Sequence, residues 1–92
     1  MGDGVTATRA DRTEANVALA IAQILRDLTG DDRLGVTNDM LLRDLPGWDS
    51  IKQIEAIALA EEEFNVDVSI RDFDRIATAG DLAAAIMRAK PS

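Results

Sequence analysis

The residues that could do chemistry gather in one short segment, Pro46-Gly47-Trp48-Asp49-Ser50-Ile51. A proline-glycine turn leads into Asp49, a good helix-capping residue, so Ser50 falls in the first turn of the helix that follows. Its hydroxyl is expected at the surface, beside unpaired backbone N–H groups and the positive end of the helix dipole. A phosphate ester on Ser50 would be stabilised there. A serine that serves only as a first-turn residue fits the same spacing, so that interpretation stays open.

The composition restricts what this serine can do. The chain of 92 residues contains neither Cys nor His, which excludes a disulfide, a thiolate nucleophile and a histidine general base. A hydrolase that used Ser50 as its nucleophile would need such a base, and Lys52 is two residues on, where helix side chains do not face each other. We therefore expect no catalytic residues, no metal ligands and no enzymatic activity of the chain by itself.

The charge balance indicates the kind of partner. Seventeen acidic and ten basic residues give a net charge of −7, which argues against nucleic-acid binding and suits partners with a basic docking face. No apolar run approaches the length of a membrane span, and no signal-peptide pattern opens the chain. We expect a cytoplasmic monomer that does not insert into membranes.

The pattern along the chain predicts the elements that hold the serine in place. Residues 1–10 show no periodicity and are expected to form a flexible N-terminal arm, followed by one helical domain over residues 11–90. Aromatic residues make up only 3% of the chain, and we find no strand signal. The predicted fold class is all-α: a small antiparallel four-helix bundle with three main helices, a short third helix and a long first loop.

The first helix is expected to begin at a cap formed by Asp11 or Thr13 and to end at Gly30 in a left-handed cap. Its inward residues recur at three- and four-residue spacing: Val17, Ile21, Ile24, Leu25 and Leu28. The long stretch from Gly30 to Trp48 has no period but contains several apolar side chains. We expect it to lie over the core.

The second helix is expected from Asp49 and Ser50 to about Asn65. A stripe of apolar residues predicts its buried face: Ile51, Ile54, Ile57, Ala58 and Phe64. Ser69 is expected to cap a brief third helix with its apolar residues inside, namely Ile70, Phe73 and Ile76. The capping signature returns at Thr78 and opens the last helix, which stops near Lys90 and Pro91.

Beyond these local signals, several motifs fall at the distances found in one known family. They are Asp49-Ser50-Ile51, Glu55, Glu61-Glu62-Glu63-Phe64 and Ile76-Ala77-Thr78. Over residues 13–89 the chain resembles an acyl carrier protein. The resemblance implies that Ser50 carries 4′-phosphopantetheine, derived from coenzyme A, through a phosphodiester, and that the terminal thiol of this arm holds an acyl group as a thioester. The sulfur then belongs to the cofactor, which explains how a chain without Cys handles thioesters.

The resemblance also implies roles for the neighbouring residues. Asp49 would contact the phosphopantetheinyl transferase while it caps the helix. The residues implied in docking partner enzymes are Ile51, Glu55, Glu61 and Glu62. Ile51 would make an apolar contact, and the carboxylates of the three glutamates would meet Arg and Lys side chains. Without the resemblance, the same carboxylates indicate a solvated helix face. The candidates for an acyl pocket are Ile54, Ile57, Ala58, Ile70 and Phe73.

Three departures from the family limit what the resemblance implies. Lys52 stands where an acidic residue is common, and Ala58 and Ala60 replace larger apolar residues. Trp48 before the Asp resembles the residue found there in carriers of specialised pathways.

The expected function is to deliver acyl intermediates to enzymes of fatty-acid, lipid or polyketide-type synthesis. The alternatives are an aminoacyl or peptidyl carrier and an unmodified acidic helical adaptor that binds a basic partner.

Overall fold

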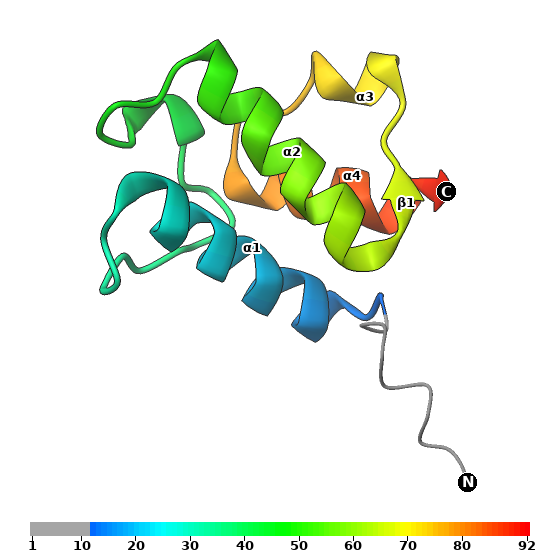
Figure 1. Ribbon diagram of the computed structural model, residues 1–92, viewed down its shortest axis with the longest axis horizontal. Coiled ribbons are helices and arrows are strands. Elements are labelled where there is room, and N and C mark those ends of the chain that lie inside the picture. Colours follow the sequence, from blue (N-terminus) through cyan, green and yellow to red (C-terminus); the bar gives the residue numbers. More distant parts are fainter. Residues whose placement is uncertain (1–11) are drawn as a thin grey trace, which may run out of the picture.

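A computed structural model describes residues 12–92, and the predicted fold class, a small helical bundle, is confirmed (Figure 1). The predicted arm over residues 1–10 and Asp11 lie outside the described residues. The helices and strands follow in this order: α1 (Glu14–Thr29), η2 (Leu42–Asp44, a 3-10 turn), α2 (Ser50–Phe64), β1 (Val66–Asp67), α3 (Ile70–Phe73), α4 (Ala79–Arg88) and β2 (Lys90–Pro91).

The predicted helix ends are confirmed where they are described. Thr13 caps α1 through a hydrogen bond from the Asn16 amide, and Gly30 ends the helix with φ 72°. Asn65 ends α2 in the same left-handed region, with φ 56°. Thr78 opens α4 with a capping box, because its hydroxyl accepts from the amide of Asp81, whose carboxylate accepts from the Thr78 amide.

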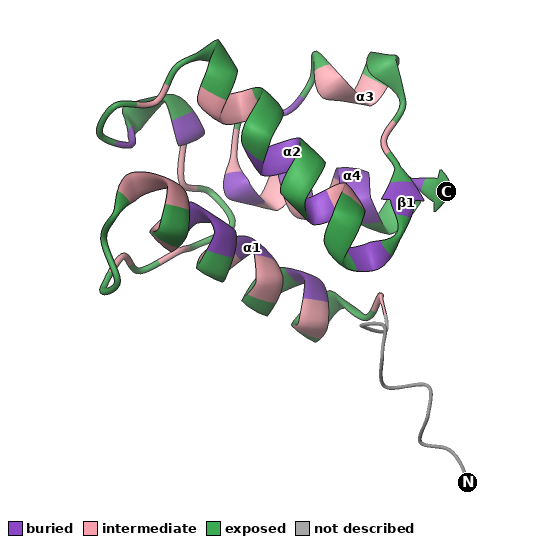
Figure 2. Ribbon diagram, viewed as in Figure 1, coloured by how far each residue is buried: buried purple, intermediate pink, exposed green. Residues whose placement is uncertain are grey.

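The core lies where α1 packs against both α2 and α4 (Figure 2). The inward residues predicted for α1 are buried or, in the case of Leu28, packed against the core. On α4 the buried residues are Ala79, Leu82, Ala85 and Ile86. Since the buried residues of this interior are all apolar in the part of the chain that the structure describes, burial of apolar surface is its main source of stability.

The buried face of α2 differs from the predicted stripe. Ile51 and Ile54 are 61% and 50% exposed, and Ala58 is exposed as well. The residues that α2 buries are Ala56, Ile57, Ala60 and Phe64. The prediction gave too much weight to large aliphatic residues, whereas two small alanines one turn apart occupy the face that packs on the bundle.

The position of Ile70 was also predicted wrongly. It begins α3 with 85% of its surface exposed, while Phe73 is half-buried against the core and Ile76 is buried. α3 has only four residues, and none of them is buried.

A short strand pair was not predicted. Val66 pairs with Pro91 and Asp67 with Lys90 in an antiparallel register, so the end of the described chain lies beside β1 (Figure 1). Two residues a strand are too few to show the alternation by which a strand is found in a sequence.

The long segment between α1 and α2 is attached to the start of α4. The Leu42 amide donates to the Ala77 carbonyl at 3.0 Å, the Ala79 amide to the Met40 carbonyl at 3.0 Å, and the Gly80 amide to the Asn38 carbonyl at 2.8 Å. These bonds confirm that the loop lies over the bundle, and they place η2 next to the residues that link α3 to α4.

Candidate functional site

Ser50 is the first residue of α2, and its side chain is exposed. The preceding Asp49 accepts a hydrogen bond from the Lys52 amide at 2.9 Å, which fixes the start of the helix. The Ser50 hydroxyl has no hydrogen-bond partner among residues 12–92. A group attached to this oxygen would therefore meet the positive end of the α2 dipole without displacing a bond within the described part of the chain.

The wall next to Ser50 is built around Trp48. The indole Nε1 donates to Gln53 Oε1 at 3.2 Å, and Gln53 Nε2 donates to the Ile76 carbonyl at 3.1 Å. The Gln53 amide thus joins the loop before α2 to the residues before α4. Sequence reasoning did not select Gln53, although it stands three residues after Ser50, a spacing that puts two residues on one helix face.

A cavity of about 400 Å³ opens beside this wall. It lies between η2, the start of α2 and the link between α3 and α4, and its lining includes the serine itself: Leu42, Arg43, Trp48, Asp49, Ser50, Gln53, Ile76 and Ala77. Arg43 was not selected from the sequence either, because it lies in the long loop, where no period places a side chain.

The residues expected to dock partners do not all face the same way. Ile51, Glu55 and Glu62 are exposed, and their spacing of four and seven residues places them on one stripe of α2. Glu61 is half-buried, and its carboxylate accepts from the Val68 amide at 2.8 Å. That bond holds the segment after β1 against α2, so the Glu61 side chain has a structural partner within the domain.

The candidates for an acyl pocket are spread over the core and the surface. Ile57 is buried, Phe73 is half-buried, and the other three are exposed: Ile54, Ala58 and Ile70. None of the five lines the cavity beside Ser50 or either of the two cavities described next. Their role in holding cargo stays a prediction.

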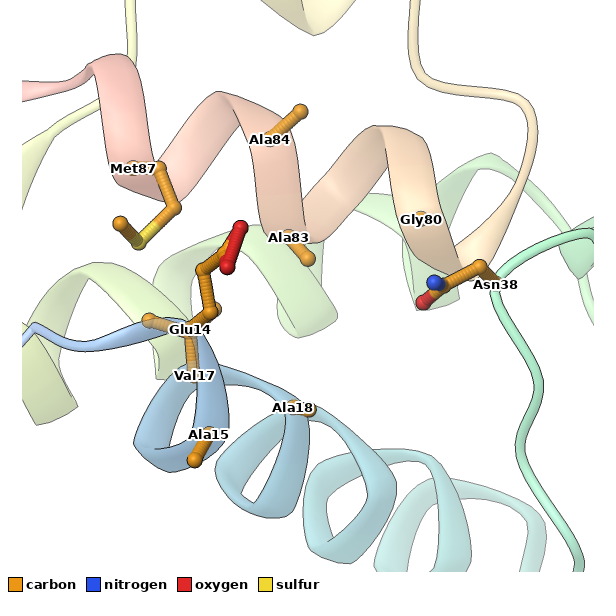
Figure 3. A pocket seen from close by; sticks show the side chains of 9 residues that line it. All are labelled: Glu14, Ala15, Val17, Ala18, Asn38, Gly80, Ala83, Ala84 and Met87. Carbon is orange, nitrogen blue, oxygen red and sulfur yellow. The ribbon is translucent and has the colours of Figure 1, made fainter.

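The two further cavities lie along α1. One, of about 470 Å³, lies between α1 and α4 beside their contact, and small residues such as Ala18 and Ala83 line it (Figure 3). Figure 3 also shows Glu14 extending from α1 into this space, with Gly80 and Asn38 at its far end. The other lies between α1 and α2 and includes Glu62 and Glu63. Neither cavity includes Ser50.

Asp81 stabilises the link that carries Ile76 and Ala77. Its Oδ2 accepts from the Ala77 amide and the Thr78 amide, each at 3.0 Å. The Ala77 bond, followed by the Thr78 bond, holds the pKa of the Asp81 carboxyl below its ordinary value of 3.8. The ionised form of Asp81 thus stabilises one side of the Ser50 cavity.

The fold and the site define a class: a small helical bundle that presents an exposed serine at the start of its second main helix. Among the described residues, none of the helices combines the length and the apolar character that a membrane span requires. The sequence matches the family described as phosphopantetheine attachment site over residues 20–86. The match covers most of the chain, and the chain belongs to this family. No solved structure matches the chain significantly.

Membership of this family establishes the cofactor. Domains of the family carry 4′-phosphopantetheine as a covalent group, and they interact with phosphopantetheinyl transferases and synthase enzymes. The described residues fit such a group, because an exposed hydroxyl without a partner stands at a helix start and opens on a cavity with apolar walls and one cationic side chain. Domains of this kind are in general carriers without catalytic activity of their own.

Proposed function

We propose that this chain is an acyl carrier protein and that Ser50 is its attachment residue. The observation that supports Ser50 is its position: it is exposed at the first turn of α2, has no hydrogen-bond partner for its hydroxyl in the described residues, and lies inside the matched segment. When bound, 4′-phosphopantetheine supplies a thiol that holds the acyl group as a thioester. The protein's own residues anchor and orient the arm.

The surroundings of Ser50 support distinct roles for its neighbours. Asp49 holds the helix start and, being exposed, remains accessible to the transferase. The stripe of Ile51, Glu55 and Glu62 combines an apolar contact with two carboxylates, a surface that suits a synthase with Arg or Lys around an apolar depression. Glu61 takes a smaller part in docking because the Val68 amide already occupies its carboxylate.

Acyl intermediates of fatty-acid, lipid or polyketide-type synthesis are the proposed cargo. An aminoacyl or peptidyl group would use the same arm and the same serine, so it is the second candidate. An unmodified acidic adaptor is disfavoured because the family match includes the attachment segment. Mass spectrometry of the intact protein purified from its native cell would identify the cargo directly.

Attachment is tested with coenzyme A and a broad-specificity phosphopantetheinyl transferase, followed by intact mass and peptide mapping. The wild-type chain should gain the mass of one arm, and Ser50→Ala should gain none while keeping its helical circular dichroism. Ser69→Ala is the matched control, since Ser69 is also exposed at the start of a helix and lies in the matched segment. Labelling of Ser50→Ala would overturn the assignment.

A further inference from the structure

The cavity beside Ser50 has the shape and chemistry to hold more than the point of attachment. Three of its walls are apolar, formed by Leu42, the Trp48 indole and the Ile76–Ala77 segment. Its volume of about 400 Å³ falls within the range of small-molecule sites, about 300–1,000 Å³. An apolar depression of this size that includes Ser50 in its lining can hold an organic group attached to the serine.

The Trp48 wall is fixed in position before any ligand arrives. The indole is half-buried, and its Nε1 donates to Gln53, whose amide in turn donates to the Ile76 carbonyl. Because both hydrogen bonds connect separate segments, the ring is held at the edge of the cavity that it lines, so little further entropy is lost there when a ligand binds. Gln53 is thus a positioning residue for Trp48.

The charges that line the cavity suit one end of the arm. Arg43 is its only cationic lining residue, and Asp49 is its only anionic one. The Asp49 carboxylate already accepts from the Lys52 amide, whereas the Arg43 guanidinium is exposed and has no ion-pair partner among residues 12–92. A guanidinium binds a phosphate through charge-assisted hydrogen bonds, and the start of α2 adds to the attraction.

On the other side of Ser50, three aliphatic side chains lie on the surface. Ile51 and Ile54 on α2 and Ile70 on α3 are exposed, and none of them lines a described cavity. An arm laid over that face would be covered on one side only, whereas the cavity next to Trp48 offers apolar contacts from η2, from the start of α2 and from the link between α3 and α4.

We propose that the arm on Ser50 folds back toward η2, with its phosphodiester at Arg43 and the dimethyl-bearing pantoyl unit against the Trp48 indole. This inference rests on the proposed attachment at Ser50 and deepens it by assigning a binding site to the protein-proximal half of the arm. It leaves the exposed face of Ile51, Ile54 and Ile70 free for partner enzymes while the arm is held.

The sole tryptophan of the chain makes this testable without any assay of activity. The apo chain is converted to the holo form with coenzyme A and a transferase, and intact mass is measured on the same sample. Attachment should shift Trp48 fluorescence to shorter wavelength and lower its acrylamide quenching constant by roughly twofold, because the arm covers the exposed part of the ring. Nuclear Overhauser effects should connect the arm's methyl protons to Trp48 and Ile76.

A matched pair of variants tests the role of the charge. Arg43→Gln should still gain the full mass of the arm but lose most of the fluorescence change, while Arg33→Gln, an exposed arginine outside the cavity, should behave as wild type. Attachment at Ser50 with unchanged quenching, or with methyl contacts to Ile54 or Ile70 instead, would overturn this inference alone. Failure of the chain to gain the arm would overturn the proposed function and this inference together.

Discussion

The carbonyl oxygen of Asn38 lies 2.7 Å from the point where a Cβ on Gly80 would stand. The Gly80 amide donates to this same oxygen at 2.8 Å, and the two residues are neighbours at one end of the α1–α4 cavity (Figure 3). A glycine in the first turn of α4 is thus what allows the long loop to attach there, because no other residue permits so close a backbone approach.

Gly80→Ala is expected to lower the free energy of unfolding by about 1–3 kcal/mol, as overpacked sites do. The gain in helix propensity, up to about 1 kcal/mol, does not offset this, because the obstacle is a backbone carbonyl that is itself hydrogen bonded. Urea denaturation measures the difference.

Gly35→Ala is the control for that variant, since Gly35 lies in the same loop without a positive φ and an added Cβ would meet no atom within 4 Å. It should leave stability unchanged or raise it by about 0.4–1 kcal/mol. Equal unfolding free energies for the two variants would show that the loop does not depend on Gly80.

Asp81→Asn is expected to change how stability depends on pH. The pKa of the Asp81 carboxyl is lowered in the folded chain by bonds from the Ala77 and Thr78 amides, so its ionised form stabilises the fold above the ordinary value of 3.8. This contribution is lost as pH falls below 3.8 and through the lower folded pKa. The variant should lose about 0.3–1 kcal/mol at neutral pH and show a shallower decline in acid.

Melting temperatures measured from pH 7 into the acid range would check this, with Asp32→Asn as the control because Asp32 is exposed in the loop after α1. The interpretation fails if the Asp81 and Asp32 variants lose stability in parallel with the wild-type chain as pH falls.

Lys52→Asp is expected to speed modification by a general phosphopantetheinyl transferase. Lys52 Nζ lies 3.9 Å from Glu55 Oε1, and its side chain is 36% exposed, so it neutralises part of the acidic face next to Ser50. Exchanging repulsion for attraction at an exposed pair would alter the docking step by roughly 2- to 30-fold at low ionic strength, less as salt rises.

Rates of coenzyme A incorporation measure this effect, and Arg33→Asp makes the same charge change outside the Ser50 cavity. Equal rates for wild type and Lys52→Asp in low salt would show that the Lys52–Glu55 pair is only a surface contact.

Moderate salt or millimolar Mg²⁺ is expected to raise the melting temperature. Between Asp49 and Asp67 the chain carries six acidic side chains and only Lys52 as a basic one, within a net charge of −7. At 0.1 M salt the Debye length is about 10 Å, so repulsion between exposed charges that are farther apart than this is largely screened. A flat or falling melting temperature up to ~0.15 M salt would mean that these carboxylates are already compensated.

Much of the fold could be predicted from the sequence because its signals are local. Caps such as Thr13 and Thr78 and the left-handed ends at Gly30 and Asn65 depend on residues within one turn of each other. The attachment of the loop to residues 77–80 could not be found in this way, because it joins backbone atoms far apart in the chain.

In the site too, some residues could be predicted from local signals and others depend on contacts between distant parts of the chain. Ser50 and its cap are evident from neighbouring residues, whereas Arg43 and Ile76 reach the cavity only through the loop's tertiary contacts. The error on α2 has a different cause: Ile54 is apolar but exposed, and Ala60 is small but fully buried. The size of an apolar side chain therefore does not show by itself whether its helix face packs in the core or lies exposed on the surface.

The bonds between the long loop and α4 also bear on which part of the folded chain opens most easily. Joining Asn38 to Gly80 closes a stretch of about forty residues, at an entropic cost of ~3 kcal/mol beyond any constant term. Opening these few bonds does not require α1 to separate from α2, so we expect the long loop and the start of α4 to have a lower local stability than the α1–α2 core. Amide hydrogen exchange is therefore expected to be faster at Leu42 and Gly80 than at Ile21 and Leu25. The long loop and the start of α4 are then the first part of the bundle to open.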